Sequence, residues 1–247
     1  MALLKLENVN KRFGGVVAAN DVSFEVQAGE IKGLIGPNGA GKSTLLNLIS
    51  GIYECDSGRI TFLDQDITKT RSYRRARMGI ARTFQTPHFL KKSSIRDNLM
   101  LGVDLYEQRG FWKSFLSDSK YNFESEVAKL LKIADLEIDW DMDISSIPYG
   151  QQKRLEIVRA LLSNPRLILI DEPAAGLNTA ELERVSDLVR YASGMGVGVI
   201  LIEHRMDMVL NLCENIVVLN FGEVIAHGTA KEVAQDPVVI EAYLGKD

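Results

Sequence analysis

The sequence predicts an α/β fold with a core built on a mainly parallel sheet. An antiparallel β subdomain is expected at the N-terminus, and an α-helical subdomain is expected as an insertion into the core. Short runs of Ile, Val and Leu recur between longer helical patterns, as is typical of parallel strands that are buried on both faces. The first part of the chain instead alternates apolar and polar residues beside turn residues, which favours antiparallel strands. Between about Pro87 and Gln152 the pattern is mainly helical.

Each element follows from one of these patterns. Buried parallel strands are predicted at Ile31–Ile35, 167–170, 197–202 and 216–219, and antiparallel strands at 3–9 and 22–26, beside the turn residues Gly14-Gly15 and Asn20-Asp21. Helices are predicted over 44–50, 95–104, 110–120, 124–136 and 153–162. Asn178 and Thr229 each stand three residues before a Glu, the spacing of a capping box at a helix start. We expect a single domain over residues 1–247, with a core of 1–86 and 152–247 and a helical subdomain of 87–151.

The composition is that of a globular protein. A chain of 247 residues with 46% hydrophobic residues can bury a sizeable core. No stretch approaches the roughly 18 consecutive apolar residues that cross a bilayer, and the first residues lack the apolar region and cleavage site of a signal peptide. We therefore expect the protein in the cytosol.

The cysteines and the charges disfavour two classes of function. Cys55 and Cys213 lie far apart without zinc or disulfide spacing, so we predict two buried free thiols. The formal net charge is −4, and the basic residues are scattered apart from a short cluster at Arg71, Arg74, Arg75 and Arg77. A nucleic-acid-binding surface is therefore not expected.

A phosphate-binding loop is predicted directly after the strand Ile31–Ile35. The segment from Gly36 to Ser43 fits the pattern GxxxxGK[ST], between a strand and a helix as the motif requires. Glycines let backbone N–H groups surround the phosphates, and the helix N-terminus adds partial positive charge. Lys42 is expected to reach the β- and γ-phosphates, and the Ser43 hydroxyl to bind Mg²⁺. The alternative is a glycine-rich turn that fits the pattern by chance.

This motif predicts a P-loop NTPase core. The expected nucleotide-binding residues of the loop and the helix start are Gly36, Pro37, Asn38, Gly39, Ala40, Gly41, Lys42, Ser43 and Thr44.

A second anchor for the metal is predicted where the strand 167–170 ends. A P-loop needs a carboxylate at the end of a neighbouring apolar strand, and Asp171 supplies one that holds Mg²⁺ through its water shell. Glu172 projects differently and can polarise a water for attack on the γ-phosphate, as a general base does. A solvated turn is the alternative for this acidic pair.

Several further segments occur in a fixed order along the chain. They are Gln85 in Arg82-Thr-Phe-Gln85, the segment Ile147-Pro-Tyr-Gly-Gln151, the pair Asp171-Glu172, the segment Ala175-Gly-Leu-Asn178, and His204 after a strand. Read together, they resemble the Q-loop, signature, Walker B motif, D-loop and switch histidine of ATP-binding cassettes. The resemblance covers nearly the whole chain.

The resemblance implies an ATPase that uses ATP and Mg²⁺. Glu172, His204 and Gln85 are then the catalytic residues, and Gln85 joins Ser43 and Asp171 at the metal. His204 would bond the γ-phosphate. Because Gln85 lies where the core passes into the helical insertion, it can couple ligand state to the angle of that insertion.

The same resemblance implies how the nucleotide base and a second subunit are bound. Phe13 resembles the aromatic residue that stacks on adenine. Tyr149, Gly150 and Gln151 head the signature helix, whose free N–H groups form an anion site. In the family that site contacts ATP held by the opposite subunit, so ATP joins a head-to-tail dimer. His88 and His227 have no such context, and no catalytic role is assigned to them.

Two positions depart from the family pattern. Pro148 stands where the signature LSGGQ has serine, and proline donates neither a hydroxyl nor a backbone hydrogen bond to the γ-phosphate. The amides of Gly150 and Gln151 remain, and Tyr149 can partly compensate. We therefore predict slow hydrolysis at the site that this signature completes. Asn178 replaces the usual Asp of the D-loop but can still cap the following helix.

The type of transporter is implied by details of these motifs. Residues 172–178, the Tyr-Gly-Gln-Gln form of the signature, 203–207 and the ending 241–245 resemble the ATPases of branched-chain amino acid importers. In that family two ATPases pair, as a homo- or heterodimer, beneath transmembrane permease subunits, and an extracytoplasmic solute-binding protein delivers the amino acid. We therefore expect the protein at the cytoplasmic side of the plasma membrane. Urea or amide uptake and lipopolysaccharide export remain alternatives.

A surface for the membrane partner is expected just past the Q-loop. The segment 86–90, with Phe89-Leu90 beside a proline, and the helix start at 95–99 are apolar. Core of the helical insertion is the alternative reading of these residues.

Two other classes of P-loop protein differ from this sequence. Chromosome-maintenance ATPases separate their nucleotide motifs by long coiled coils, whereas about 130 residues without sustained heptads separate Lys42 from Asp171. A small-molecule kinase needs an acceptor pocket and has no use for a signature or a switch histidine.

Overall fold

The N-terminal sheet is antiparallel, as predicted, in the computed structural model, which describes residues 2–107 and 119–244. Its strand order is β2 (Val16–Val26), β1 (Leu4–Phe13), β4 (Ser57–Phe62), β5 (Gln65–Asp66). Gly14, with a φ of 57°, turns the chain from β1 into β2. The pair Asn20-Asp21 lies inside β2 rather than at its start. Asp21 has a φ of 54° there, and the register with β1 shifts.

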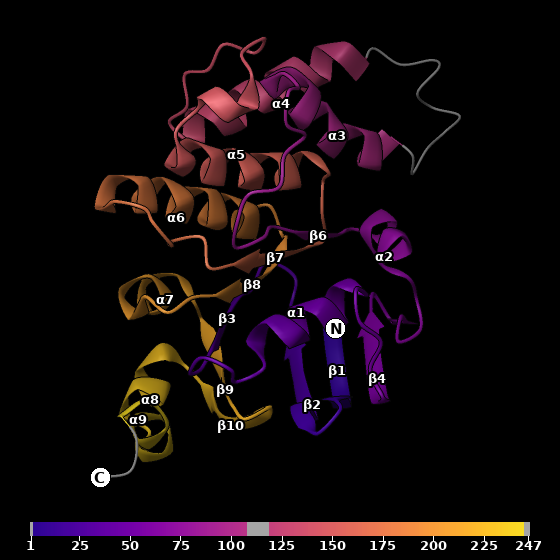
Figure 1. Ribbon diagram of the computed structural model, residues 1–247, viewed down its shortest axis with the longest axis vertical. Coiled ribbons are helices and arrows are strands. Elements are labelled where there is room, and N and C mark those ends of the chain that lie inside the picture. Colours follow the sequence, from indigo (N-terminus) through magenta and orange to yellow (C-terminus); the bar gives the residue numbers. More distant parts are fainter. Residues whose placement is uncertain (1, 108–118, 245–247) are drawn as a thin grey trace.

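The second sheet is mainly parallel and forms the centre of the molecule (Figure 1). Its strand order is β10 (Glu223–Gly228), β9 (Asn215–Asn220), β3 (Ile31–Ile35), β8 (Gly198–Ile202), β7 (Leu167–Asp171), β6 (Ile80–Arg82). Neighbours from β9 to β6 are parallel, and β10 is antiparallel to β9. Every residue of β7 and β8 is buried, which explains their continuous apolar sequences.

The helical insertion lies between β6 and β7 in the sequence and forms the top layer of Figure 1. It contains α3 (Ile95–Glu107), α4 (Ser119–Ile133), a 3₁₀ turn (Ile144–Ser146) and α5 (Tyr149–Leu162). Its core is formed by Ile95, Leu99, Val127, Leu130, Leu155 and Val158. The helix α4 ends before 136, as Asp135 takes a left-handed φ of 53°. Most of the predicted helix 110–120 lies outside the described residues.

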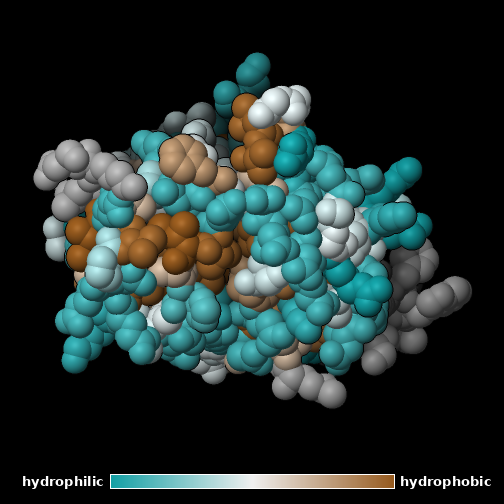
Figure 2. Space-filling model, turned by 90° about the horizontal axis from the view of Figure 1, so that it is seen from below, coloured by the Kyte–Doolittle hydropathy of each residue, from teal (hydrophilic) through white to brown (hydrophobic). Residues whose placement is uncertain are grey.

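The remaining helices flank the sheets. They are α1 (Lys42–Ser50), α2 (Ser72–Met78), α6 (Thr179–Gly194), α7 (Met206–Leu212), α8 (Ala230–Gln235) and α9 (Pro237–Leu244). The predicted capping boxes at Asn178 and Thr229 are both formed. The helix α9 exposes Val238 and Ile240, and Figure 2 shows apolar residues at the surface of the end of the molecule away from the helical layer.

Some elements and one thiol differ from the expectations. The strands β4, β6 and β10 were not predicted, because β6 is very short and the other two are partly or fully exposed at most positions, so none has a continuous apolar run. Cys213 is buried, as expected, but Cys55 is only partly buried in the loop after α1. Within the described ranges, no helix is long and apolar enough to cross a membrane.

Candidate functional site

The predicted phosphate loop joins β3 to α1 and opens to solvent. Its exposed residues are Asn38, Gly39 and Ser43. Gly41 has a φ of 103°, and a Cβ at this position would lie 2.3 Å from the carbonyl oxygen of Ala18 on β2. Only glycine therefore lets the loop pass β2 at the start of α1.

The side chain of Lys42 is folded under this loop. Its Nζ donates hydrogen bonds to the carbonyl oxygens of Gly36 at 2.7 Å and Pro37 at 2.9 Å. Burial lowers the pKa of Lys42, while the negative charges of Glu172 and Asp171 oppose this shift. The lysine is thus held between the phosphate loop and the two predicted acidic residues.

The order of the strands corrects one expectation about Asp171. We expected it at the end of a strand next to β3, but β8 lies between β3 and β7. The carboxylate of Asp171 is largely buried, and its Oδ2 lies 3.4 Å from Nη2 of Arg82. Burial raises the pKa of Asp171, and the Arg82 guanidinium opposes this rise.

The carboxylate of Glu172 is held from two sides. Its Oε2 accepts a hydrogen bond from Nε2 of Gln85 at 2.7 Å, and its Oε1 lies 2.7 Å from Nε2 of His204. Glu172 has a left-handed φ of 46°, and its N–H donates to the carbonyl oxygen of Ile202. The structure thus brings together the three side chains for which sequence analysis predicted catalytic roles.

The start of α5 adjoins this group. The hydroxyl of Tyr149 donates to the carbonyl oxygen of Gln85 at 3.2 Å, which joins the signature to the Q-loop within one chain. Pro148 is the N-cap, and no side chain caps the helix. The N–H of Gln151 donates to the carbonyl oxygen of Pro148 at 3.0 Å, whereas no acceptor for the N–H of Gly150 is found within the described chain. Of the two amides expected to bind phosphate, the one at Gln151 is therefore already engaged.

An aromatic pair lies at the end of β1. The ring of Phe13 is 42% exposed and meets the ring of Tyr53 edge-on, with 5.2 Å between centroids. The Nζ of Lys11 lies 5.4 Å from the centroid of the Phe13 ring. One face of Phe13 can therefore stack on a base, while Tyr53 and Lys11 support the ring. Sequence analysis missed Tyr53.

Buried charged residues that sequence analysis also missed hold the loops of the site. Glu203 accepts a hydrogen bond from the N–H of Ala174 at 2.6 Å, and Glu156 accepts from the N–H groups of Phe84 and His88. Burial raises the pKa of both carboxyls. In the sequence, Glu156 stands between Leu155 and Ile157 and Glu203 directly follows the apolar strand 197–202, which is a usable signal for a buried polar contact.

The predicted docking residues have different surroundings. Phe89 packs against the core, with the guanidinium of Arg159 4.6 Å from its ring centroid, as the core alternative predicted. Leu90 is 51% exposed. A largely apolar groove of about 450 Å³ instead lies next to this segment, lined among others by Ile52, Phe84 and Leu101.

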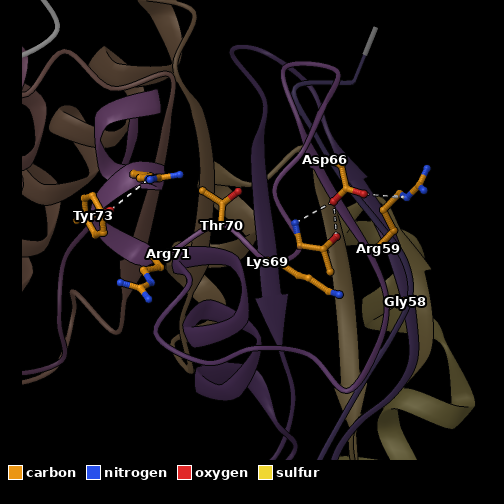
Figure 3. Close-up of a pocket in the computed structure, with 9 residues that line it drawn as sticks. Gly58, Arg59, Asp66, Lys69, Thr70, Arg71 and Tyr73 are labelled. Atoms are coloured by element: carbon orange, nitrogen blue, oxygen red, sulfur yellow. Dashed lines mark hydrogen bonds and ion pairs between the residues drawn. The ribbon is translucent and has the colours of Figure 1, made fainter.

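A larger, open hollow of about 840 Å³ lies between β4 and the start of α2. Figure 3 shows that its basic side chains point apart: Arg59 turns to Asp66, while Lys69 and Arg71 extend in other directions. The hollow is therefore not a convergent site.

Comparisons with known proteins agree with this geometry. A family profile described as ABC transporter matches residues 19–175, and one described as branched-chain amino acid ATP-binding cassette transporter matches residues 223–247. The probable branched-chain amino acid transport ATP-binding protein LivG of Archaeoglobus fulgidus is 37% identical over 253 residues, covering 99% of this chain and 96% of that protein. The high-affinity LivG of Escherichia coli (strain K12) is 34% identical over 250 residues, with 99% and 98% covered.

The fold comparison gives the same result. The solved structure of the ADP conformation of MJ1267, an ATP-binding cassette of an ABC transporter, matches with a TM-score of 0.85 at 35% identity and covers all of both chains. A nucleotide-free cassette from an ABC transporter matches with a TM-score of 0.84 at 34% identity, again over all of both chains. This chain therefore belongs to the ABC transporter family and is an ATP-binding cassette ATPase.

Proposed function

We propose that this chain hydrolyses ATP to energise an importer of branched-chain amino acids. The observation that carries the hydrolytic role is the Glu172 carboxylate, which lies 2.7 Å from both Nε2 of Gln85 and Nε2 of His204. The names of the relatives support the transported substrate, since they are called branched-chain amino acid transport ATP-binding proteins.

In this proposal Glu172 takes the proton from the water that attacks the γ-phosphate. Gln85 and His204 orient the two carboxylate oxygens of Glu172. Lys42 and the backbone N–H groups of the phosphate loop bind the β- and γ-phosphates. Phe13 stacks on the adenine. Glu172 then gives this proton to the departing phosphate or to solvent, which restores the carboxylate for the next water.

Mg²⁺ fits the oxygen donors around this loop. They are the exposed hydroxyl of Ser43, the carboxylate of Asp171 and the side-chain oxygen of Gln85, which are hard ligands of the kind that Mg²⁺ prefers. Residues 2–107 and 119–244 contain no group of three or more His, Cys, Asp or Glu able to hold a metal alone. A metal shared with phosphates and water needs no such group. When bound, it neutralises charge on the phosphates.

A second cassette is proposed to complete the site. Tyr149, Gly150 and Gln151 would contact ATP held by the other subunit, and the N–H of Gly150 is available for this. A side chain at Gly150 would have to displace the Glu181 carboxylate, because a Cβ there would overlap Oε1 of Glu181. The result is an ATP-dependent homo- or heterodimer.

The permease subunits are proposed to dock in the apolar groove near the Q-loop. Its walls come from α1, α2 and β6 on one side and from α3 and α5 on the other. Leu101 and Gly102 of α3 belong to the proposed helical subdomain, 87–151, and the other lining residues belong to the proposed core, 1–86 and 152–247, so the groove touches both. A protein seated there would sense their relative position. Docking would hold the chain at the cytoplasmic face of the membrane, and a solute-binding protein would act through the permease.

The test compares Mg²⁺-dependent ATP hydrolysis and oligomeric state for the wild type and Glu172→Gln. The variant should lose at least about 100-fold in kcat, as expected when a general base is removed. It should also form a stable dimer with ATP. Normal hydrolysis by the variant would contradict the role of Glu172. Uptake of labelled leucine, as opposed to urea, by the assembled transporter tests the substrate.

A further inference from the structure

Arg82 is a largely buried cation that the proposed chemistry does not use. It is the last residue of β6, and its side chain is only 10% exposed. Its Nη1 donates to Oδ1 of Asn47 at 2.5 Å and to Oγ of Ser50 at 3.2 Å, while its Nη2 lies 3.4 Å from Oδ2 of Asp171. A single guanidinium therefore joins α1 to the end of β7.

Through these contacts Arg82 is linked to two of the expected metal ligands, Ser43 and Asp171. Asn47 follows Ser43 by about one turn of α1. The hydrogen bond from Arg82 to Asn47 therefore also holds the helix that presents the Ser43 hydroxyl. The other end of the guanidinium meets Asp171. One side chain, that of Arg82, thus links the helix that carries Ser43 to Asp171.

Arg82 also forms part of the groove proposed for permease docking. It lines that groove together with Ser50 and Phe84, and its guanidinium lies 5.0 Å from the centroid of the Phe84 ring. A segment that presses on Phe84 or Ser50 therefore presses on the group that contacts Asp171.

The bonding of Arg82 is incomplete, which favours a second arrangement. Its Nε is buried and has no hydrogen-bond partner among the described residues. The contact with Asp171, at 3.4 Å, is longer than the roughly 2.8 Å of a strong charged hydrogen bond. A small shift of the guanidinium can therefore improve its bonding and move Asp171 at little cost.

We propose that Arg82 is a positioning residue that sets the spacing between Ser43 and Asp171 and transmits permease docking to them. The proposal rests on the proposed function for the groove and for the metal. Arginine suits the role because its planar fork reaches two partners in fixed directions, which the single ammonium of lysine cannot do.

The sign of the expected effect separates positioning from simple charge. Removing a cation next to a metal site would by itself strengthen Mg²⁺ binding. A weaker response to Mg²⁺ after loss of Arg82 therefore points to lost positioning of the ligands.

Arg75 provides a matched control. It is a fully buried arginine on α2 that also bonds to the end of α1, through the carbonyl oxygens of Leu48 and Ile49. Its other two hydrogen bonds go to the carbonyl oxygens of Thr70 and Thr68, so that its partners are backbone groups and not a carboxylate of the site. Loss of Arg75 should lower stability without changing the response to Mg²⁺.

The first experiment measures binding of a fluorescent ATP analogue, with EDTA and across a Mg²⁺ titration, in subunits that carry Glu172→Gln. In Arg82→Met, binding in EDTA should stay within about twofold, while the Mg²⁺ midpoint should rise about 10-fold, as for loss of one charged hydrogen bond. Asn47→Ala, which keeps the cation, and Arg82→Lys should shift the midpoint in the same direction. These two variants carry the test if Arg82→Met does not fold.

Three results would overturn the positioning role: a midpoint unchanged or lowered in Arg82→Met, full rescue by lysine, or an equal shift in Arg75→Met. Failure of the parent Glu172→Gln subunit to respond to Mg²⁺ would instead refute the proposed function itself. In the reconstituted transporter, Arg82→Met should lose stimulation of ATP hydrolysis by the permease, whereas Arg75→Met should keep it. Retained stimulation in Arg82→Met would exclude the link to the groove.

Discussion

Nε2 of His204 lies 2.7 Å from Oε1 of Glu172, and the two residues follow neighbouring strands, β8 and β7. Gln85, which holds the other oxygen of Glu172, follows β6 on the far side of β7. Three adjacent parallel strands thus end at one edge of the sheet and deliver the three side chains together. This arrangement explains why residues so far apart in the sequence form a single site.

Replacing His204 with alanine tests its role at Glu172. Loss of the ring frees one carboxylate oxygen and removes the expected contact to the γ-phosphate. We expect kcat to fall by about 100-fold with little change in KM, the pattern for a contact made mainly in the transition state. Steady-state ATP hydrolysis measures this. His227→Ala on the exposed strand β10 is the control, and equal losses in both variants would refute a specific role for His204.

The buried carboxyl of Glu156 should make stability depend on pH. Burial raises its pKa in the folded protein above the ordinary value of 4.5. The folded protein therefore binds this proton more tightly than the unfolded chain. The stabilisation is complete below pH 4.5 and is lost as pH rises through the folded pKa.

The variant Glu156→Gln has no such proton. Relative to this variant, the wild type should lose stability as pH rises above 4.5, by at most about 1.4 kcal/mol per pH unit, until the folded pKa is passed. Urea unfolding of both proteins between pH 5 and 8 measures the difference, and other titrating groups cancel. A difference that stays constant, or changes in the opposite direction, would show that Glu156 titrates normally.

The sequence predicted the strands and motifs that repeat a simple pattern. The strand β3 has the predicted bounds, and the capping box at Asn178 was found from its spacing alone, because both depend on local chemistry. The contacts of Arg82 with Asn47 and Asp171 had no such signal. They join residues from three elements, and a charged residue in a three-residue strand shows no pattern of its own.

The exposed ring of Phe13 should contribute to ATP affinity. A base stacked on an aromatic ring is worth about 1–3 kcal/mol, so that Phe13→Ala should raise the Kd for ATP by about 5- to 150-fold. Equilibrium binding measures this, and Val16→Ala, at another exposed apolar residue of the same hairpin, is the control. If Phe13→Ala leaves the Kd unchanged, the base is bound elsewhere. Tyr53→Ala should have a smaller effect, since Tyr53 only supports the ring edge-on.

Pro148 should slow hydrolysis at the site that this signature completes. It caps α5 without a side-chain hydrogen bond, and the N–H of Gln151 is already bonded to its carbonyl oxygen. The γ-phosphate of a partner's ATP would therefore meet the N–H of Gly150 but no hydroxyl.

The substitution Pro148→Ser adds that hydroxyl at a position where serine is also a favourable N-cap. We expect kcat of the ATP-bound dimer to rise by about 3- to 10-fold, equivalent to about 0.7–1.4 kcal/mol, the ordinary net value of one added hydrogen bond. Pro148→Ala separates the two changes, because it removes the proline ring without adding a hydroxyl. A rise in both variants would assign the effect to release of the backbone, and no rise in either would show that the missing serine does not limit turnover.

The effect of Pro148→Ser on stability differs in origin: the added cap contributes about 1 kcal/mol to α5, partly offset by the greater freedom of the unfolded chain. Turnover and thermal unfolding measured on the same three proteins therefore distinguish a faster enzyme from a merely more stable one.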